Sequence, residues 1–403
     1  MVKVRNVKDK REKNEKIREG REDYKAKIKK YKMASVYRFG AVVLILGILA
    51  AIIYVQYKNH IYTDYEYLSA VSINRVTGTE SIRLGDHVLT YGHDGAHCTN
   101  TDGVEIWNQT FEMQNPIVEV CGEMVAIGDY NGREVYVLNT EKKVCQINTT
   151  MPIRNLAVSA QGRVAVAVTD KEITWIYVYE ADGTAAYEVK TTMSQSGYPI
   201  DFSFSPNGTL LGISCVFVDA GVVTSKVAFY NFGPVGSGKT DYFVGAHNYP
   251  DVIIPYIRFL SEDSAAAVGD DRLIFYSGSQ VPAPIAQHLF EDEIQGVYQN
   301  GDYLGLVFKS DVLDMHNKIE VYKKDSQKMG TFYFDTLLED VVFTKEYLAV
   351  YGGNKCVIKT YDDVEKFSGD FEHSIDLLIP VGTGSGYKFV LVSGDGINTV
   401  QLK

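Results

Sequence analysis

The sequence has few of the residues that mark several common kinds of protein. Its five cysteines are odd in number and widely spaced, so no disulfide framework is expected. They are Cys98, Cys121, Cys145, Cys215 and Cys356. Cys121 and Cys215 lie in apolar runs and are predicted to be buried thiols. Residues 39–57 lack any charged side chain, and beyond residue 60 no stretch keeps a helical period of 3.6 residues. The body is therefore expected to be built from strands.

Charge is distributed unevenly along the chain. Lys and Arg total 40 against 51 Asp and Glu, a net charge of −11. Residues 1–38 hold 15 basic and 6 acidic side chains, whereas residues 58–403 hold 25 basic and 45 acidic ones. An acidic body repels phosphate backbones, so no nucleic-acid partner is expected. A composition of 45% hydrophobic and 23% charged residues excludes wholesale disorder.

One segment is long and apolar enough to cross a membrane. The seventeen apolar residues from Phe39 to Val55 rise about 26 Å as a helix, and flanking tyrosines extend the segment to the interfaces. A cleaved signal peptide is disfavoured, because 38 residues precede the segment and no small-residue cleavage site follows it. Residues 39–57 are therefore predicted to form a transmembrane signal-anchor helix.

The flanks of this helix predict its orientation. The basic excess precedes it and the acidic body follows it, so residues 1–38 should be a cytoplasmic tail and residues 60–403 should lie outside the cell membrane. The tail interleaves opposite charges at helical spacing, which favours an exposed, solvated helix. The lysines between Lys25 and Lys32 should be attracted to anionic lipid headgroups. A binding site for a cytoplasmic partner is the alternative for this tail.

The body contains a repeat of short strands. Two-residue apolar cores recur at a mean spacing of 43 residues, and strands flank each core between Asp-Gly or Asn-Gly turns. The cores are Val88-Leu89, Val125-Ala126, Val164-Ala165, Leu211-Gly212, Ala266-Ala267, Leu304-Gly305, Leu348-Ala349 and Phe389-Val390. Four strands every 40–45 residues are typical of β-propeller blades. The fold class is thus an all-β propeller, with eight blades favoured and seven left open by two long spacings.

The two ends of the body are expected to complete one blade together. The last unit, Asp376 to Lys403, has room for three strands. The segment from Tyr65 to Asn74 has no unit of its own. We predict that it supplies the missing outer strand, because this closes the ring and leaves no long free edge.

The repeat units carry none of the common propeller signatures. They lack a Trp-Asp dipeptide and a repeated kelch Gly-Gly, and only Asp102 to Trp107 is similar to the turn of quinoprotein-like propellers. A further likeness lies in the anchor helix, Trp107-Asn108, Gly197-Tyr-Pro199, Ser205-Pro-Asn-Gly208 and Phe229-Tyr-Asn-Phe-Gly233. In these segments the chain resembles a family of single-pass, membrane-anchored propeller proteins from Gram-positive bacteria. This resemblance implies a WD40-like propeller outside the membrane. The family has no assigned function, so no catalytic residue follows from it.

The strongest motif match is to a phosphate-binding loop. Gly233 to Thr240 fits the pattern G-x4-G-K-[ST], which would place Lys239 and Thr240 on nucleotide phosphates and magnesium. That chemistry requires a helix to begin at Lys239. Aromatic, strand-like residues follow instead and end at Pro250. The segment is therefore predicted to be a hairpin loop, with no bound nucleotide.

Other clusters of polar residues have plain structural interpretations. His93, Asp94, His97 and Cys98 are metal-ligand types, but Asp94-Gly95 predicts a hairpin turn with exposed histidines and no second cluster completes a tetrahedral set. Gly382 to Gly386 is expected to be a loop without the helix of a dinucleotide site. Acidic runs such as Asp270-Asp271, Glu291-Asp292-Glu293 and Asp362-Asp363 are expected to be solvated carboxylates at turns.

These observations assign no catalytic, cofactor-binding or metal-ligating residue. They favour a membrane-tethered scaffold that presents its ring to an envelope protein partner, without catalysis. A propeller that binds a glycan or small ligand, or acts on one, is the alternative. A third hypothesis is a single-pass sensor, in which ligand binding outside the membrane is transmitted to residues 1–38.

Overall fold

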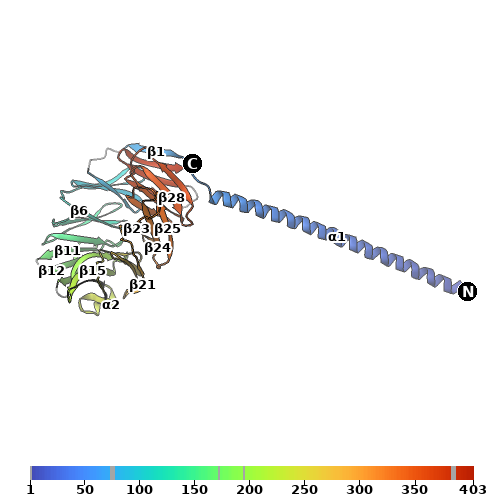
Figure 1. The fold of residues 1–403 in the computed structure, drawn as a ribbon, viewed down its shortest axis with the longest axis horizontal. Coiled ribbons are helices and arrows are strands. Elements are labelled where there is room, and N and C mark those ends of the chain that lie inside the picture. The colour runs from blue at the N-terminus through green and yellow to red at the C-terminus, as the bar shows by residue number, and fades with distance from the viewer. Residues whose placement is uncertain (1, 73–77, 171–172, 194–195, 383–386) are drawn as a thin grey trace. The chain divides into compact units, whose positions relative to one another are not determined.

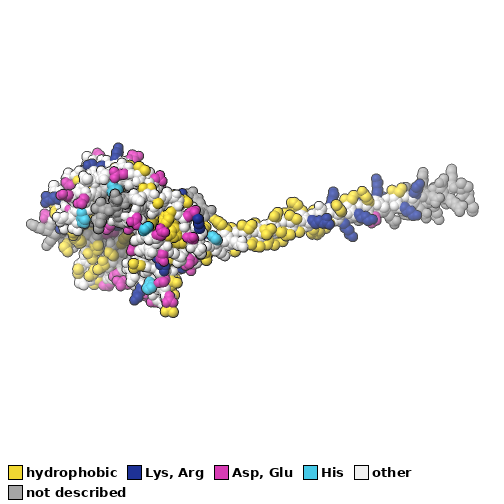
Figure 2. All heavy atoms as spheres, turned by 90° about the horizontal axis from the view of Figure 1, so that it is seen from above, with side chains coloured by type: hydrophobic (Ala, Val, Ile, Leu, Met, Phe, Trp, Pro, Cys, Tyr) yellow, Lys and Arg dark blue, Asp and Glu magenta, His cyan; other side chains and the backbone are white. Residues whose placement is uncertain are grey.

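The computed structural model describes residues 2–72, 78–170, 173–193, 196–382 and 387–403. The chain divides into two units, Met1–His60 and Ile61–Lys403. The first unit is the helix α1 (Val2–Lys58), which includes the predicted transmembrane segment. Figure 2 shows its hydrophobic side chains gathered in one stretch and its Lys and Arg side chains in the stretch before it. Among the described residues, α1 is the one helix long and apolar enough to cross a membrane.

The second unit is an eight-bladed β-propeller of four-stranded antiparallel sheets. Blade 1 consists of β2 (Glu80–Leu84), β3 (His87–Tyr91), β4 (Gly95–Thr99) and β5 (Glu105–Thr110). Blade 2 consists of β6 (Pro116–Cys121), β7 (Met124–Asp129), β8 (Glu134–Asn139) and β9 (Lys143–Asn148). Blade 3 consists of β10 (Ile153–Val158), β11 (Val164–Asp170), β12 (Ile173–Tyr179) and β13 (Ala185–Thr192). Blade 4 consists of β14 (Tyr198–Phe204), β15 (Leu210–Asp219), β16 (Val222–Asn231) and β17 (Phe243–Pro250).

The remaining blades repeat this order. Blade 5 consists of β18 (Tyr256–Phe259), β19 (Ser264–Val268), β20 (Arg272–Ser277) and β21 (Ala283–Leu289). Blade 6 consists of β22 (Gly296–Gln299), β23 (Tyr303–Lys309), β24 (Asn317–Lys323) and β25 (Lys328–Phe334). Blade 7 consists of β26 (Asp340–Phe343), β27 (Tyr347–Gly352), β28 (Lys355–Thr360) and β29 (Glu365–Asp370). Blade 8 consists of β30 (Leu377–Pro380), β31 (Lys388–Ser393), β32 (Gly396–Leu402) and β1 (Tyr65–Ser72). Each predicted two-residue core lies in the second strand of a blade, so the eight-blade prediction is confirmed.

The N-terminal strand of the propeller closes the ring, as the sequence predicted. β1 pairs antiparallel with β32 from Tyr65↔Leu402 to Ser72↔Gly396, and Figure 1 shows the C-terminus beside β1. Ile73 and Asn74 of the predicted strand lie outside the described residues. The amide of Lys403 also donates to the carbonyl of Asp64 at 2.8 Å. Backbone hydrogen bonds therefore join the beginning of the propeller to its end.

The alternating strands give the ring two faces with different loops. The joining face carries the turns between the second and third strands and the connections from each blade to the next. The terminal face carries the other turns, and there the chain enters at Ile61 and ends at Lys403. Because every blade has four antiparallel strands, successive turns alternate between these faces all round the ring.

The hydrophobic core is divided among the joints between blades. Seven clusters, each between consecutive blades from 1 to 8, hold nine to fourteen buried residues. The cluster between blades 8 and 1 holds six, and Val88 is its one member from blade 1. We call this joint the seam. Among the described residues, apolar packing is thinnest at this joint, where the ring closes.

Candidate functional site

The joining face presents the most exposed apolar side chains of the propeller. The four large hydrophobic residues with the greatest exposure are Leu313 (86%), Leu337 (74%), Val218 (68%) and Leu289 (67%). Each lies in a loop or at a strand end on the joining face. Single exposed apolar residues are ordinary on a soluble surface, but a concentration on one face indicates an interaction surface.

The same face is strongly acidic. Its described loops contain fifteen acidic side chains and one basic side chain, Arg133. The acidic residues are Asp94, Glu112, Asp251, Asp270, Asp271, Glu291, Asp292, Glu293, Asp311, Asp314, Asp335, Glu339, Glu372, Asp376 and Asp395. Loops of the terminal face are comparably rich in carboxylates, but Lys142, Arg163, Lys239, Lys324, Lys345 and Lys403 lie among them or at the chain end. Negative potential is therefore least compensated on the joining face.

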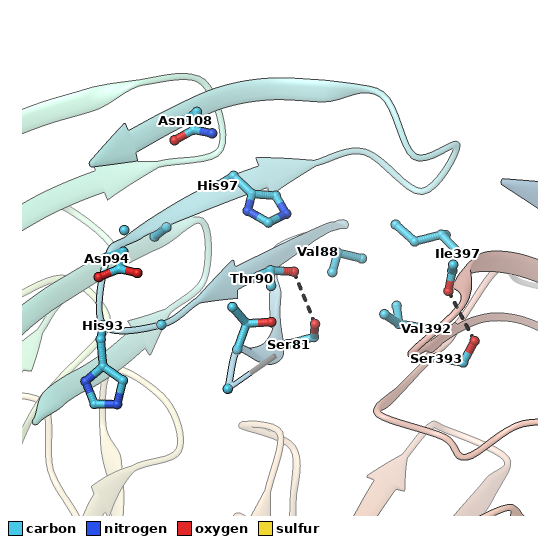
Figure 3. A pocket seen from close by; sticks show the side chains of 16 residues that line it. Ser81, Val88, Thr90, His93, Asp94, His97, Asn108, Val392, Ser393 and Ile397 are labelled. Carbon is cyan, nitrogen blue, oxygen red and sulfur yellow. Dashed lines mark hydrogen bonds between the residues drawn. The ribbon is translucent and has the colours of Figure 1, made fainter. Parts of the chain in front are cut away.

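A pocket of about 250 Å³ opens at the joining-face end of the seam. Four cross-strand partners of blade 1 line it as a row, one from each strand: Ser81, Thr90, His97 and Asn108. Directly paired residues point to the same side of a sheet. Figure 3 shows Ser81, Thr90 and His97 beside Val392 and Ile397 of blade 8. Blade 1 thus contributes the polar row together with Val88, and blade 8 contributes Val392, Ile397 and Ser393.

The histidine cluster seen in the sequence contributes to this pocket but does not converge. His93 and Asp94 lie in the turn between β3 and β4, as predicted, and the His93 imidazole pairs with the carbonyl of Met113 at 3.0 Å. The His97 ring lies apart from that of His93 (Figure 3). Cys98 is buried on the other side of β4. Among the described residues, no three His, Cys, Asp or Glu side chains come together as a metal site.

The central channel is crossed by one arginine. Arg258 on β18 approaches Glu119 of blade 2 (Nη2 to Oε1, 3.0 Å) and Asp201 of blade 4 (Nη1 to Oδ2, 2.6 Å). Its guanidinium also lies over the ring of Tyr256. Carboxylates and an aromatic ring therefore do converge at the channel, but an arginine links them into a brace between three blades. The two carboxylates keep the pKa of Arg258 above its ordinary value.

The two carboxylates of this brace lie in different electrostatic environments. Burial raises the pKa of Glu119 to about 7, because desolvation outweighs the attraction to Arg258 and Asp201 repels a second negative charge. Asp201 also accepts a hydrogen bond from the Ile257 amide at 2.9 Å. The arrangement fixes the inner strands of distant blades. It does not place a nucleophile beside a base, so its geometry supports a structural role.

The phosphate-loop match lies between two strands of one blade, as predicted. Gly233 to Thr240 connects β16 and β17 on the terminal face through the short helices α2 (Pro234–Ser237) and η1 (Thr240–Tyr242). Lys239 has extended backbone angles, and β17 begins three residues after Thr240. The helix that would direct amides at a phosphate does not begin at Lys239. Of the Gly382 to Gly386 loop, residues 383–386 lie outside the described residues.

All five cysteines are free thiols. The prediction of burial is confirmed for Cys215, but it is wrong for Cys121, which is only half-buried. Cys121 lies at the end of β6, where the strand meets a turn and packing is incomplete. Cys98 and Cys356 are buried as well. Burial raises the pKa of Cys356 to about 12, so this thiol is a packing residue and not a nucleophile.

The comparisons with known proteins support the fold and the family. No curated protein matches the sequence. The propeller is similar to Sqt1 of Saccharomyces cerevisiae, with a TM-score of 0.51 and 14% identity over 86% of this chain and 99% of that one. BamB from Moraxella catarrhalis gives a TM-score of 0.48 and 11% identity over 84% of this chain and 100% of that one. The likeness to Sqt1 is one of fold alone.

Residues 58–402 match the family described as "Family of unknown function (DUF5711)". The chain belongs to this family. The match confirms the resemblance drawn from the sequence, that of a propeller family without an assigned function.

Proposed function

We propose that this member of the family is a membrane-anchored, non-enzymatic scaffold whose joining face binds a protein partner in the cell envelope. In this proposal residues 1–38 are a cytoplasmic tail, residues 39–57 span the cell membrane, and residues 60–403 lie outside the cytoplasm. The observation that carries it is the coincidence on one face of the most exposed apolar side chains with the least compensated acidic loops. Interfaces combine an apolar centre with a polar rim in this way.

A hollow between blades 6 and 7 shows how such a surface is built. It measures about 460 Å³, is lined by Tyr298, Val307 and Leu338, and has Leu337 at its edge. The neighbouring loop carries Leu313, the most exposed large apolar residue of the propeller. Apolar side chains of a partner would bury both leucines, and each such burial is worth about 1.5–3 kcal/mol.

The two loops around this hollow are held together by hydrogen bonds. The His316 amide donates to the carbonyl of Phe334 at 3.0 Å. The Asn317 side-chain amide donates to the carbonyl of Thr336 at 2.7 Å. A surface fixed before binding loses less entropy when the partner docks.

Charge around the hollow indicates the chemistry of the partner. Loops 290–295, 310–316 and 335–339 carry seven carboxylates and no Lys or Arg. Lys318 and Lys355 on adjoining strands approach Asp292 and Asp335, so among the described residues five of the carboxylates make no ion pair with Lys or Arg. A second copy of this acidic propeller would be repelled. The partner should therefore present Lys or Arg around an apolar centre.

Site-specific photo-crosslinking tests the scaffold proposal in intact cells. A photoreactive amino acid replaces Leu313 on the joining face, and a matched variant replaces Val104, which is exposed on the terminal face. We expect a discrete crosslinked protein from position 313 and a much weaker one from position 104. Equal yields from both positions, or no specific adduct from either, would overturn the proposal.

The topology is tested separately by protease protection. Protease added to intact protoplasts should digest the propeller and leave a fragment that contains the N-terminal tail. Protection of the whole chain would contradict the proposed orientation, whatever the crosslinking shows.

A further inference from the structure

The seam pocket continues the hydrophobic core at the place where the core is thinnest. Val88, Val392 and Ile397 belong both to the six-residue cluster of the seam and to the lining of the pocket. Among the described residues, the clusters at the other joints hold nine or more buried side chains each. A molecule bound here would therefore complete the packing between the first and last blades, independently of any partner on the joining face.

The polar row provides hydrogen-bonding groups on the wall formed by blade 1, and Ser393 adds a hydroxyl on the wall formed by blade 8. The hydroxyls of Ser81 and Thr90 lie 3.1 Å apart, so one donates to the other and the second hydroxyl proton is left for a ligand. Burial lowers the pKa of His97, which keeps the imidazole neutral at pH 7, with one nitrogen donating and one accepting. Asn108, beside His97, offers both an amide donor and an amide acceptor.

The charge of the described lining favours a neutral ligand. Within the described residues, no Lys or Arg lines the pocket, and its single charged residue is the exposed Asp94 at the turn. A phosphate or carboxylate would lose its hydration without gaining a cation, which costs several kcal/mol in a partly apolar site. The described lining therefore favours neutral ligands over nucleotides and anionic metabolites.

The volume limits the ligand to a small molecule. An apolar cavity of about 150 Å³ accommodates benzene. The seam pocket, with about 250 Å³, should hold about ten non-hydrogen atoms on the same scale. Ligand sites commonly combine apolar walls with a few placed polar groups, and this pocket has that composition.

We propose that the seam pocket binds a neutral organic molecule the size of a substituted phenol. Its apolar body would lie against Val88, Val392 and Ile397, and its hydroxyl or carbonyl group would face His97 and Asn108. Because the ligand contacts both the first and the last blade, its binding stabilises the closed ring over states in which the seam has opened.

The experiment uses the full-length protein in nanodiscs of neutral lipid and 4-ethylphenol as the probe. Equilibrium dialysis measures bound against free probe, and 4-ethylbenzoate, of similar shape but anionic, is the chemical control. We expect saturable binding of the phenol and at least about tenfold weaker binding of the benzoate. Failure of the wild-type protein to bind the phenol saturably, or equal binding of both probes, would overturn the inference.

Two variants locate the binding in the pocket. Thr90→Val keeps the shape of the side chain but removes its hydroxyl, and should weaken the phenol about two- to tenfold. Asn108→Leu should weaken it similarly. Asn148→Leu, an exposed asparagine on the outer strand of blade 2, is the matched control and should leave the affinity unchanged. An equal loss in the control variant would place the binding elsewhere and refute the seam site.

Discussion

The channel brace makes a specific prediction about pH and stability. In the folded protein Glu119 shares Arg258 with Asp201, and the arginine lies nearer to Asp201. The Glu119 side chain is about three-quarters buried, and its pKa rises from 4.5 to about 7. Replacing Glu119 with Gln removes this titration while it keeps the size and hydrogen-bonding shape of the side chain.

The direction in which stability changes with pH follows from whether the folded or the unfolded state holds the proton. Between pH 4.5 and 7 the folded protein keeps a proton on Glu119 that the unfolded chain has released. The contribution of Glu119 protonation to the stability of the folded state is therefore fully present below pH 4.5, and it is lost as the pH rises through about 7. A rise of this size corresponds to about 3 kcal/mol in the free energy of unfolding. The Glu119→Gln variant should not lose this contribution.

The measurement is the melting temperature of full-length protein in detergent, followed by near-ultraviolet circular dichroism from pH 5 to pH 8. The entropy of unfolding is about 2.1 cal/mol/K per residue, so the melting temperature of a propeller of some 340 residues shifts by about 1.4 °C for each kcal/mol of stability. We expect the wild-type protein to lose about 4 °C relative to Glu119→Gln over this range. Glu141→Gln, in an exposed turn of the terminal face, is the control and should follow the wild type.

A difference between wild type and Glu119→Gln that stays constant from pH 5 to pH 8 would refute this reasoning. It would mean that attraction to Arg258 compensates the burial of Glu119 fully. A wild-type protein that gains stability relative to the variant as the pH rises would show that the pKa of Glu119 is lowered in the folded state.

Three further predictions test the closure, the thiols and the phosphate-loop match. Gly396→Ala should lower the melting temperature by about 2–4 °C, because its Cβ would collide with the backbone of β1. Gly394→Ala is the control and should not lower it, because Gly394 has open space around it. Equal effects of the two substitutions would contradict the closure argument. Iodoacetamide should modify Cys356 at least about tenfold more slowly than the half-buried Cys145 in the native protein, as read by mass spectrometry of tryptic peptides; comparable rates would show that the core around Cys356 opens. ATP with magnesium should be retained no better by wild-type protein than by Lys239→Ala in filter binding, and saturable retention that Lys239→Ala abolishes would restore the nucleotide interpretation.

The ring could be predicted from the sequence because its signals are local and repeat. Each second strand has an apolar core such as Leu304-Gly305, and Asn or Asp before Gly marks many of the turns. The missing strand of the last unit also follows from counting, since a three-stranded final blade needs one more strand. Tyr65 to Asn74 was the segment without a blade, and its described part, Tyr65 to Ser72, fills that position.

Counting strands along the sequence also predicts which acidic turns lie together on the joining face, although each turn taken alone indicates only a solvated loop. In a ring of four-stranded blades every second turn lies on the same face. Glu291 to Glu293 and Asp270-Asp271 therefore share a face, and this can be derived without coordinates once the strands are assigned. The alternation of turns is the signal that finds this surface.

The brace and the seam could not be predicted in this way. Arg258 and Glu119 are 139 residues apart, and their approach depends on the width of the channel, which the strand pattern does not encode. The row from Ser81 to Asn108 requires the register of three strand pairs, and β-bulges such as the one between Cys98 and Thr99 shift that register. Single strands reveal their buried face, but not which residues become cross-strand neighbours.

The polar seam borders the blade in which the two ends of the propeller pair. Most joints of the ring are held by apolar side chains packed between blades, so a polar row there would weaken them. Like every other joint, the seam is also bridged by the chain, because β1 pairs within the last blade and precedes β2 of the first in sequence. Backbone pairing and chain continuity thus keep blades 8 and 1 together with little side-chain packing. The pocket with its polar row lies at this joint, which has the fewest buried apolar side chains among the described residues.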